Sequence, residues 1–233
     1  MTSSAALPAG RSAAGRPAPV ASVKATREDW LGLAQSLLAC DGIAAVTVLD
    51  LSERLGVSRS SFYWYFRNRE ELLDALLRRW ESLNTRSIVQ QAGAPAGSIN
   101  EAICNVFRCW VDPRLYSPRL DSAVREWARR SKTVRLVLDR SDGERVSAIE
   151  AMFERHGYEH DEALARARVL YYTQIGYYAL DIDEPMEARL KLAPHYLETF
   201  SGVAPRDEEL AAFRAYALSH AGAADAARDG GDR

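Results

Sequence analysis

The sequence contains little cysteine, no long apolar run and almost no excess of charge, and each shortage excludes a class of protein. Three cysteines occur among 233 residues, namely Cys40, Cys104 and Cys109, and no two of them form a CxxC pair. Such a set is neither a disulfide framework nor a zinc cluster, and it fits a reducing compartment. No apolar run approaches the length that spans a membrane. We therefore expect a cytoplasmic protein.

The chain is not basic as a whole, and it lacks the short motifs of enzymes. Its 30 Lys and Arg residues against 32 Asp and Glu residues give a formal charge of −2. Any contact with nucleic acid must therefore come from a local patch. The P-loop, the nucleophile elbow, HExxH and the dinucleotide fingerprint are all missing. His156 and His160 are four residues apart, but Gly157 between them indicates a solvated loop. We expect no catalytic residues, no cofactor and no metal site.

Both ends of the sequence have the composition of disordered segments. Residues 1–23 are rich in Ala, Pro, Gly, Ser and Arg, and they lack the continuous apolar core of a secretory signal. Residues 221–233, AGAADAARDGGDR, are similar in composition. We predict that both segments are disordered tails.

Between these ends helical periodicity dominates and strand signals are scarce, so the predicted fold class is all-α. A small three-helix unit is expected over residues 24–70 and a larger helical bundle over 71–220. A long helix from about residue 69 to 91 should connect them and end at the linker 92–98, AGAPAGS. Further helices are expected near 99–112, 119–131, 133–157 with a kink at Gly143, 161–181, 185–201 and 206–220.

One short segment, SRSSFYWYFRNREEL at residues 58–72, combines five consecutive aromatics with three arginines. At about 100° per residue on a helix running from Ser58 to about Phe66, Phe62 and Phe66 share an inward stripe with Tyr65 at its edge. The other face carries Arg59, Ser60, Tyr63, Trp64 and Arg67, and no acid. A capped short helix, a Gly turn and such a face have the form of a helix-turn-helix. From spacing alone, an amphipathic helix with a solvated basic face is equally compatible.

Residues 47–77, TVLDLSERLGVSRSSFYWYFRNREELLDALL, resemble the N-terminal domain of the TetR family of transcriptional regulators. The shared pattern consists of Thr47, Gly56-Val57-Ser58, Ser60-Ser61, Tyr63, Tyr65-Phe66, Arg69 and Glu71-Leu72. The sequence departs from it at Ser60, where the family usually has Gly, and at Arg69, where it usually has Lys. The resemblance implies DNA contacts from Thr47, Ser58, Arg59, Ser60, Ser61, Tyr63, Tyr65 and Arg69.

The same resemblance implies a homodimer with a small-molecule effector site in the C-terminal bundle. A lone helix-turn-helix reads a short half-site, so adequate affinity also requires a dimer. Residues 170–180, LYYTQIGYYAL, are apolar nearly all round, and such a helix must bury more than one face. It can be a core helix of the monomer or contact a partner. For the second case we expect an interface of Tyr172, Ile175, Gly176, Tyr196 and Phe200.

Polar groups among aromatic side chains are candidates for the effector site. These are Phe107, Arg108, Trp110, Trp127, Tyr171, Gln174 and Tyr178, and they favour an apolar or aromatic effector. We interpret the chain as a sequence-specific regulator of transcription, a repressor that its effector releases from double-stranded operator DNA. The alternatives are a TetR-like activator, a regulator without an effector, and an all-α enzyme or carrier with a vestigial helix-turn-helix.

Overall fold

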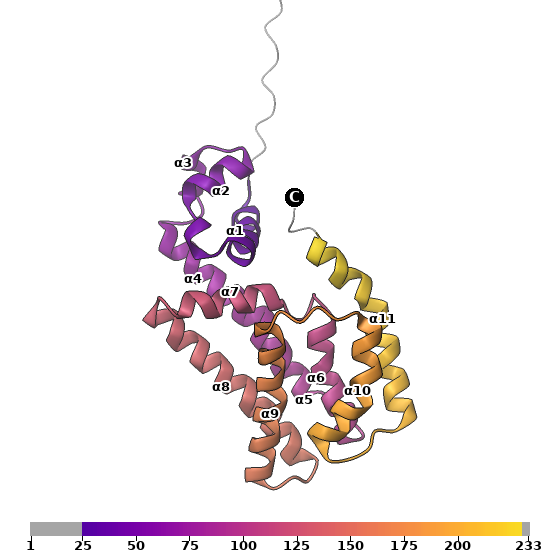
Figure 1. The fold of residues 1–233 in the computed structure, drawn as a ribbon. Coiled ribbons are helices and arrows are strands. Elements are labelled where there is room, and N and C mark those ends of the chain that lie inside the picture. Colours follow the sequence, from indigo (N-terminus) through magenta and orange to yellow (C-terminus); the bar gives the residue numbers. More distant parts are fainter. Residues whose placement is uncertain (1–24, 230–233) are drawn as a thin grey trace, which may run out of the picture.

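The computed structural model describes residues 25–229, with side chains described as far as His220, and this part of the chain is helical without any strand. The elements, labelled in Figure 1, are α1 (Arg27–Asp41), η1 (Ile43–Ala45), α2 (Val48–Leu55), α3 (Arg59–Phe62), α4 (Arg69–Trp80), η2 (Glu81–Thr85), α5 (Arg86–Gly93), α6 (Ile99–Val111), α7 (Pro118–Ala128), α8 (Lys132–Arg155), α9 (His160–Ala179), α10 (Met186–Ser201) and α11 (Asp207–Asp229). The predicted all-α fold is confirmed. The predicted tail 1–23 lies outside the described residues.

Polar side chains cap the N-terminal helices as their sequence indicates. The Asp50 amide donates to Thr47 Oγ1 at 3.1 Å at the start of α2. The Glu71 amide donates to Asn68 Oδ1 at 2.9 Å at the start of α4. Gly56 ends α2 in the left-handed region, with φ 66°, which costs a residue with a side chain about 1–2 kcal/mol. This turn redirects the chain from α2 into α3.

The second helix of the helix-turn-helix is shorter than predicted. We predicted a helix from Ser58 to about Phe66, but α3 ends at Phe62 because the chain tightens into turns over residues 63–65. Ser58 occupies the N-cap position, yet its hydroxyl pairs with Ser60 Oγ at 2.8 Å rather than with a helix N–H. The predicted inward stripe is nevertheless confirmed, since Phe62 and Phe66 are buried and Tyr65 is half-buried.

A continuous helical rod runs from Arg69 to Gly93, close to the predicted span. Its middle, η2, is a π-helical turn between α4 and α5. The predicted linker 92–98 is shorter than expected, because α5 continues to Gly93 and α6 begins at Ile99. Single π turns within α-helices are often found at functional positions.

The side chains pack into two hydrophobic cores. One contains α1 to α4 together with Leu120, Val124 and Trp127 of α7 and the first turns of α8. The other core contains residues of α5, α6, α9, α10 and α11 together with the second half of α8. Packing therefore divides within the rod, between Trp80 and Ile88, rather than at residue 70. As a result, α7 belongs to the core beneath the helix-turn-helix.

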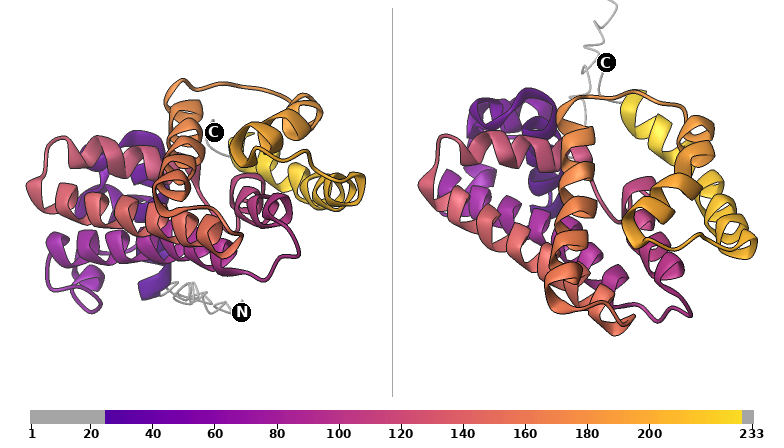
Figure 2. Two further views of the ribbon diagram at one scale, coloured as in Figure 1. Left: turned by 90° about the horizontal axis from the view of Figure 1, so that it is seen from below. Right: turned by 60° about the horizontal axis from the view of Figure 1, so that its bottom comes forward.

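The C-terminal helices form two groups. Figure 2 shows α9 along α8, and α10 and α11 beside α6, with the 180–185 connection passing between the groups. Helix α8 continues through Gly143 without a break, and the kink at this residue stays a prediction. The predicted tail 221–233 is also partly wrong, because α11 continues to Asp229 through an alanine-rich sequence that favours helix. Within the described range, no helix has the length and apolar character of a membrane span.

Candidate nucleic-acid interface and effector cleft

The exposed face of α3 and the turn after it combines a free arginine with aromatic rings. Tyr63 is 60% and Trp64 80% exposed, although large aromatic side chains are usually buried. Arg59 begins α3 and is exposed, with no ion pair or hydrogen bond within the part of the chain that the structure describes. Arg67, by contrast, is bound to Glu71 at 3.1 Å. We call Arg59, Ser60, Tyr63 and Trp64 the α3 face.

The buried aromatics hold this face in place. Phe62 packs edge-on against Trp30 of α1, with ring centroids 5.3 Å apart, and it stacks on Phe66 at 5.3 Å. The Arg27 guanidinium covers Phe66 at 4.8 Å. Figure 1 shows α2 and α3 at the end of the molecule far from α9 and α10. Within the aromatic run, Phe62 and Phe66 are therefore buried and fix α3 to the core, whereas Tyr63 and Trp64 are exposed to solvent.

Most of the predicted DNA-contact residues gather at this end of the molecule. Thr47 begins α2, Ser58 begins the turn into α3, and Ser61 Oγ donates to the Ser58 carbonyl at 2.7 Å. The half-buried Tyr65 lies at the edge of the core. Trp64 was not in the predicted set. The signal for it was its position on the acid-free face, with no apolar neighbour on the helical wheel.

Arg69 is bound to backbone rather than extended into solvent. Its Nε donates to the Val46 carbonyl at 2.6 Å and its Nη2 to the Ile43 carbonyl at 2.9 Å. These bonds tie α4 to the connection that precedes α2. A contact with phosphate would fall to its remaining nitrogen, Nη1.

A cleft with a volume of about 90 Å³ lies between the two groups of C-terminal helices. Aromatic rings form its floor: Phe107 lies 5.3 Å from Trp110, 6.2 Å from Phe200 and 5.8 Å from Phe213, between ring centroids. The remaining lining comes from the end of α6, from α9 and α10 and from the connection between these two, and consists of Val111, Leu170, Thr173, Gln174, Tyr177, Glu184, Met186, Arg189, Leu190, Ala193 and Tyr196. We call this site the aromatic cleft.

The polar groups of the aromatic cleft are unequally satisfied. Tyr177 Oη donates to Glu184 Oε2 at 3.0 Å, so this carboxylate has a donor. Arg189 lies over the Tyr177 ring at 5.3 Å and makes no ion pair within the described residues. Gln174 Nε2 and the Tyr178 hydroxyl are both buried and lie near each other, but neither makes a hydrogen bond of normal geometry within the described residues. Burial also raises the pKa of Tyr178.

Three of the seven predicted ligand residues, Phe107, Trp110 and Gln174, line this cleft. The other four do not, because their side chains pack against other parts of the molecule. Arg108 lies over the Tyr216 ring at 5.0 Å, Trp127 belongs to the N-terminal core, Tyr171 makes polar contacts between helices, and Tyr178 stacks on Tyr116 at 5.9 Å. Sequence reasoning missed Thr173, Tyr177 and Arg189. The spacing of Leu170, Thr173 and Tyr177 on one helical face was the available signal.

The residues predicted for the dimer interface differ in their exposure to solvent. Tyr172 is 56% exposed, and Ile175 and Gly176 are half-buried. Tyr196 is exposed at the aromatic cleft, but Phe200 is buried against Phe107 and cannot present its ring to a partner. An apolar stripe runs along α9 and just past its end, and it consists of the exposed Val169, Tyr172 and Leu180 with the half-buried Gly176 between them. We call it the α9 stripe.

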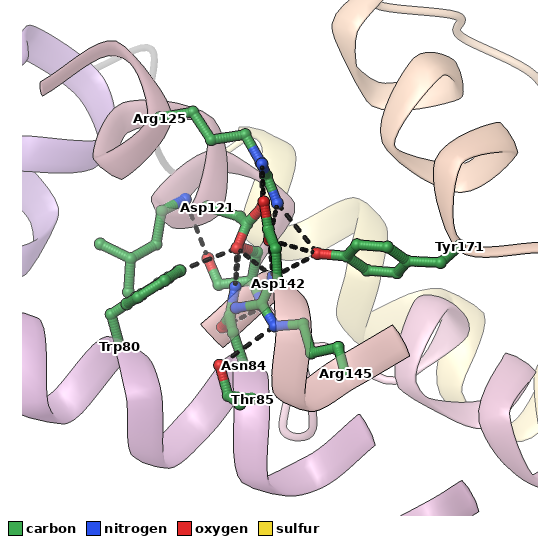
Figure 3. Close-up of polar contacts among 10 residues, drawn as sticks. Trp80, Asn84, Thr85, Asp121, Arg125, Asp142, Arg145 and Tyr171 are labelled. Carbon is green, nitrogen blue, oxygen red and sulfur yellow. Dashed lines mark hydrogen bonds and ion pairs between the residues drawn. The ribbon is translucent and has the colours of Figure 1, made fainter. Parts of the chain in front are cut away.

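Buried charges join the rod to α7, α8 and α9, as Figure 3 shows. Asp121 Oδ1 accepts from Arg145 Nη1 at 3.0 Å and from Trp80 Nε1 at 2.9 Å, while its Oδ2 accepts from Arg125 Nε at 2.8 Å. Asp142 accepts from both terminal nitrogens of Arg125 at 2.9 and 2.7 Å. We call these five residues, with Asn84, Thr85 and Tyr171, the junction cluster.

The remaining members extend the junction cluster to the π turn and to α9. Arg145 Nε donates to Thr85 Oγ1 at 3.0 Å, and Tyr171 Oη donates to Asp142 Oδ1 at 2.7 Å. Burial alone would raise the pKa of Asp121, but the charges of Arg145 and Arg125 and the nearby donors outweigh it and lower the pKa. No short motif reveals this cluster, because its partners come from distant parts of the sequence. The local signal is an Asp–Arg pair within one helical turn on each of α7 and α8, namely Asp121 with Arg125 and Asp142 with Arg145.

Within the described residues, one group of residue types that can ligate a metal lies at Glu150, Glu154 and His160. His160 Nδ1 lies 2.9 Å from Glu154 Oε1, and this hydrogen bond together with the charge of Glu150 raises the pKa of His160. His156 instead contacts the Met152 carbonyl at 2.8 Å. Because the group is exposed at its histidine, an ordinary surface ion pair accounts for it.

The sequence and the fold are both similar to known regulators. Residues 31–76 match the model of the bacterial regulatory proteins of the tetR family. The chain is 39% identical over 61 residues to the tetracycline repressor protein class C of Escherichia coli, covering 26% of this chain and 28% of that one. It is 34% identical over 76 residues to the transcriptional repressor KstR2 of Mycobacterium tuberculosis, covering 31% and 38%. The chain thus spans well under half the length of these relatives.

Solved structures cover much more of the chain. A TetR transcriptional regulator from Legionella pneumophila aligns with 85% of this chain and 98% of that one, at a TM-score of 0.56 and 16% identity. AmtR of Mycobacterium smegmatis aligns with 88% and 97%, at a TM-score of 0.58 and 19% identity. At such low identity the agreement shows a shared fold, including the C-terminal helices.

Proposed function

We propose that the chain is a member of the TetR family of bacterial regulatory proteins, and that it is a DNA-binding repressor of transcription that a small molecule releases from its operator. The observation that carries the proposal is the α3 face, where an unpaired arginine and two exposed aromatic rings lie on the matched helix-turn-helix. The named relatives are repressors of the same family. Membership of this family weighs against an all-α enzyme or carrier.

In this proposal, α3 enters the major groove and Arg59 reads a base pair. Its guanidinium can donate two hydrogen bonds to O6 and N7 of guanine. The hydroxyls of Ser58, Ser60 and Tyr63 suit phosphate oxygens, which position a protein on DNA without specifying sequence. Trp64 adds apolar contact beside them. Thr47 and Ser61 lie at the same end of the domain as α3. Tyr65 packs against the core beneath α3, and Arg69 ties α4 to the connection that precedes α2.

A second copy of the chain would supply the other half-site. Helix-turn-helix dimers read two half-sites about one helical turn apart. The α9 stripe offers an apolar surface for such a contact, and Gly176 within it would allow a close approach of two helices. We propose an interface around Tyr172, Ile175 and Gly176, with Tyr196 at its margin and Phe200 excluded by its burial.

The junction cluster gives a physical route from the aromatic cleft to the α3 face. One face of α9 lines the cleft, and Tyr171 on another face contacts Asp142, Arg125 and Arg145. Arg125 and its neighbours then hold α7, which packs in the same core as α1 and α4. A molecule that binds one arrangement of α9 better would shift the population of the helix-turn-helix geometry. The coupling cannot exceed that difference in affinity.

The first experiment is fluorescence anisotropy with genomic DNA fragments selected for binding to the purified protein. We expect Arg59→Ala to weaken specific binding by about 1–3 kcal/mol, or roughly 5- to 150-fold. Arg135→Ala, which removes an exposed arginine on α8, is the matched control and should bind as wild type. Equal affinity of the Arg59 variant and the control would contradict the proposed role of the α3 face. If the wild-type protein binds all DNA fragments with the same affinity, that result would contradict sequence-specific regulation.

A further inference from the structure

The aromatic cleft has a chemical preference, and we infer that it accepts a small aromatic carboxylate, with its ring against Phe107 and its carboxylate directed to Arg189 and Gln174. This inference rests on the proposed function, because it names the class of effector. It is carried by the shape of the cleft and by which of its polar groups lack a partner.

The floor of the cleft suits one flat ring. Phe107 makes edge-on and tilted contacts with Phe200 and Phe213, and Tyr196 stacks on Phe200 at a centroid distance of 5.9 Å near the mouth. Rings in such arrangements accept another ring by edge-to-face or offset contact. The volume is about 90 Å³. An apolar cavity of about 150 Å³ is known to hold benzene. The cleft is smaller than that cavity, so a single ring with a small head group would have to widen it or extend into its open mouth, and larger ring systems would require more widening.

The head group of the ligand follows from the unpaired donors. Gln174 Nε2 is a buried donor that makes no hydrogen bond of normal geometry in the described residues, although the Tyr178 hydroxyl lies near it, and a poorly satisfied buried donor is unfavourable. Arg189 is half-buried and held over Tyr177, but no carboxylate pairs with it in the described part of the chain. A ligand carboxylate would satisfy both groups, because it can accept two hydrogen bonds from a guanidinium and still offer a lone pair to an amide.

The one acid in the lining does not favour a cationic ligand instead. Glu184 already accepts from Tyr177 Oη at 3.0 Å, so its charge is partly satisfied within the protein. Arg189 faces the same ring from the α10 side. A cationic ligand in the cleft would therefore be repelled by the Arg189 guanidinium. An anionic ligand could accept hydrogen bonds from Arg189 and from Gln174 Nε2.

The test is calorimetric titration of the DNA-free protein with benzoate, benzamide and benzylamine, which share a ring and differ in charge. We expect benzoate to bind at least tenfold more tightly than benzamide, and benzylamine to bind more weakly than both. Arg189→Met should bring the benzoate-to-benzamide ratio close to one, and Arg189→Lys should restore part of it. Lys191→Met, an exposed change on the same helix, is the control and should keep the wild-type ratio. Phe107→Ala should weaken all three probes.

The outcomes separate this inference from the proposed function. Tighter binding of benzylamine, or an unchanged ratio in Arg189→Met, overturns the assignment of the carboxylate. Absence of binding by all three probes, in protein that still binds its DNA fragment, overturns the inference and leaves the repressor intact. Benzoate binding by a protein that selects no DNA fragment supports the cleft assignment and contradicts the repressor.

Discussion

The Arg145 side chain should contribute more to stability than any exposed arginine of this protein. It is 0% exposed and donates to Asp121 at 3.0 Å and to Tyr171 at 2.9 Å. Its guanidinium also covers the Trp80 ring at 4.9 Å. The change we propose is Arg145→Met, which keeps an unbranched apolar side chain but leaves Asp121 without one of its two arginines.

Removing one partner of a buried ion pair typically costs about 3–5 kcal/mol, because the other charge stays buried. Asp121 retains Arg125 at 2.8 Å and Trp80 at 2.9 Å, so we expect a loss near the lower end, about 3 kcal/mol. This is a large part of a total stability of roughly 5–15 kcal/mol. The double variant Asp121→Asn/Arg145→Met should lose less than the sum of the single losses, since neither charge then remains unpaired.

The measurement is urea unfolding followed by tryptophan fluorescence, at one protein concentration because a dimer would make stability depend on it. Arg135→Met removes an exposed arginine that pairs with Asp139 at 2.8 Å, and we expect it to leave the urea midpoint unchanged. If Arg145→Met and Arg135→Met shift the midpoint equally, the junction cluster does not hold the helices together as argued.

The same variants predict a dependence on pH. The pKa of Asp121 is lowered from its ordinary value of 3.8, since Arg145 and Arg125 outweigh the effect of burial. A carboxylate with a lowered pKa contributes stability at neutral pH, and this contribution is lost as the pH falls through its folded-state value. Arg145→Met should raise that pKa, so acid unfolding should begin at higher pH. Acid unfolding curves that coincide with wild type would contradict this sign.

Three other predictions follow from single positions. Gly56→Ala should lower stability by about 1–2 kcal/mol in urea unfolding, since φ is 66° there, whereas Gly143→Ala within α8 should raise it slightly. Tyr172→Asp should shift the protein from dimer to monomer in analytical ultracentrifugation, and the exposed change Leu136→Asp should not. A thiol reagent at pH 8 should label only Cys40 in the native protein, because burial raises the pKa of the other two cysteines to about 12.

The local features of this protein follow from the order of its residues. Thr47 and Asn68 cap α2 and α4, and Gly56 ends α2 at a left-handed turn. The division of the aromatic run into buried Phe62 and exposed Tyr63 also follows from helical periodicity alone. These features depend on neighbours within about one helical turn, so the order of the residues is enough to predict them. The fold class followed for the same reason.

The contacts of each helical face depend on how the helices pack. Tyr171 and Gln174 are three residues apart, yet one joins a buried ionic cluster and the other lines the aromatic cleft. Trp127 belongs to the N-terminal core, although a position in the C-terminal bundle was expected. Arg145 is buried because partners from three other helices surround it. Periodicity gives the direction of a side chain on its own helix, but its neighbours depend on how distant segments pack.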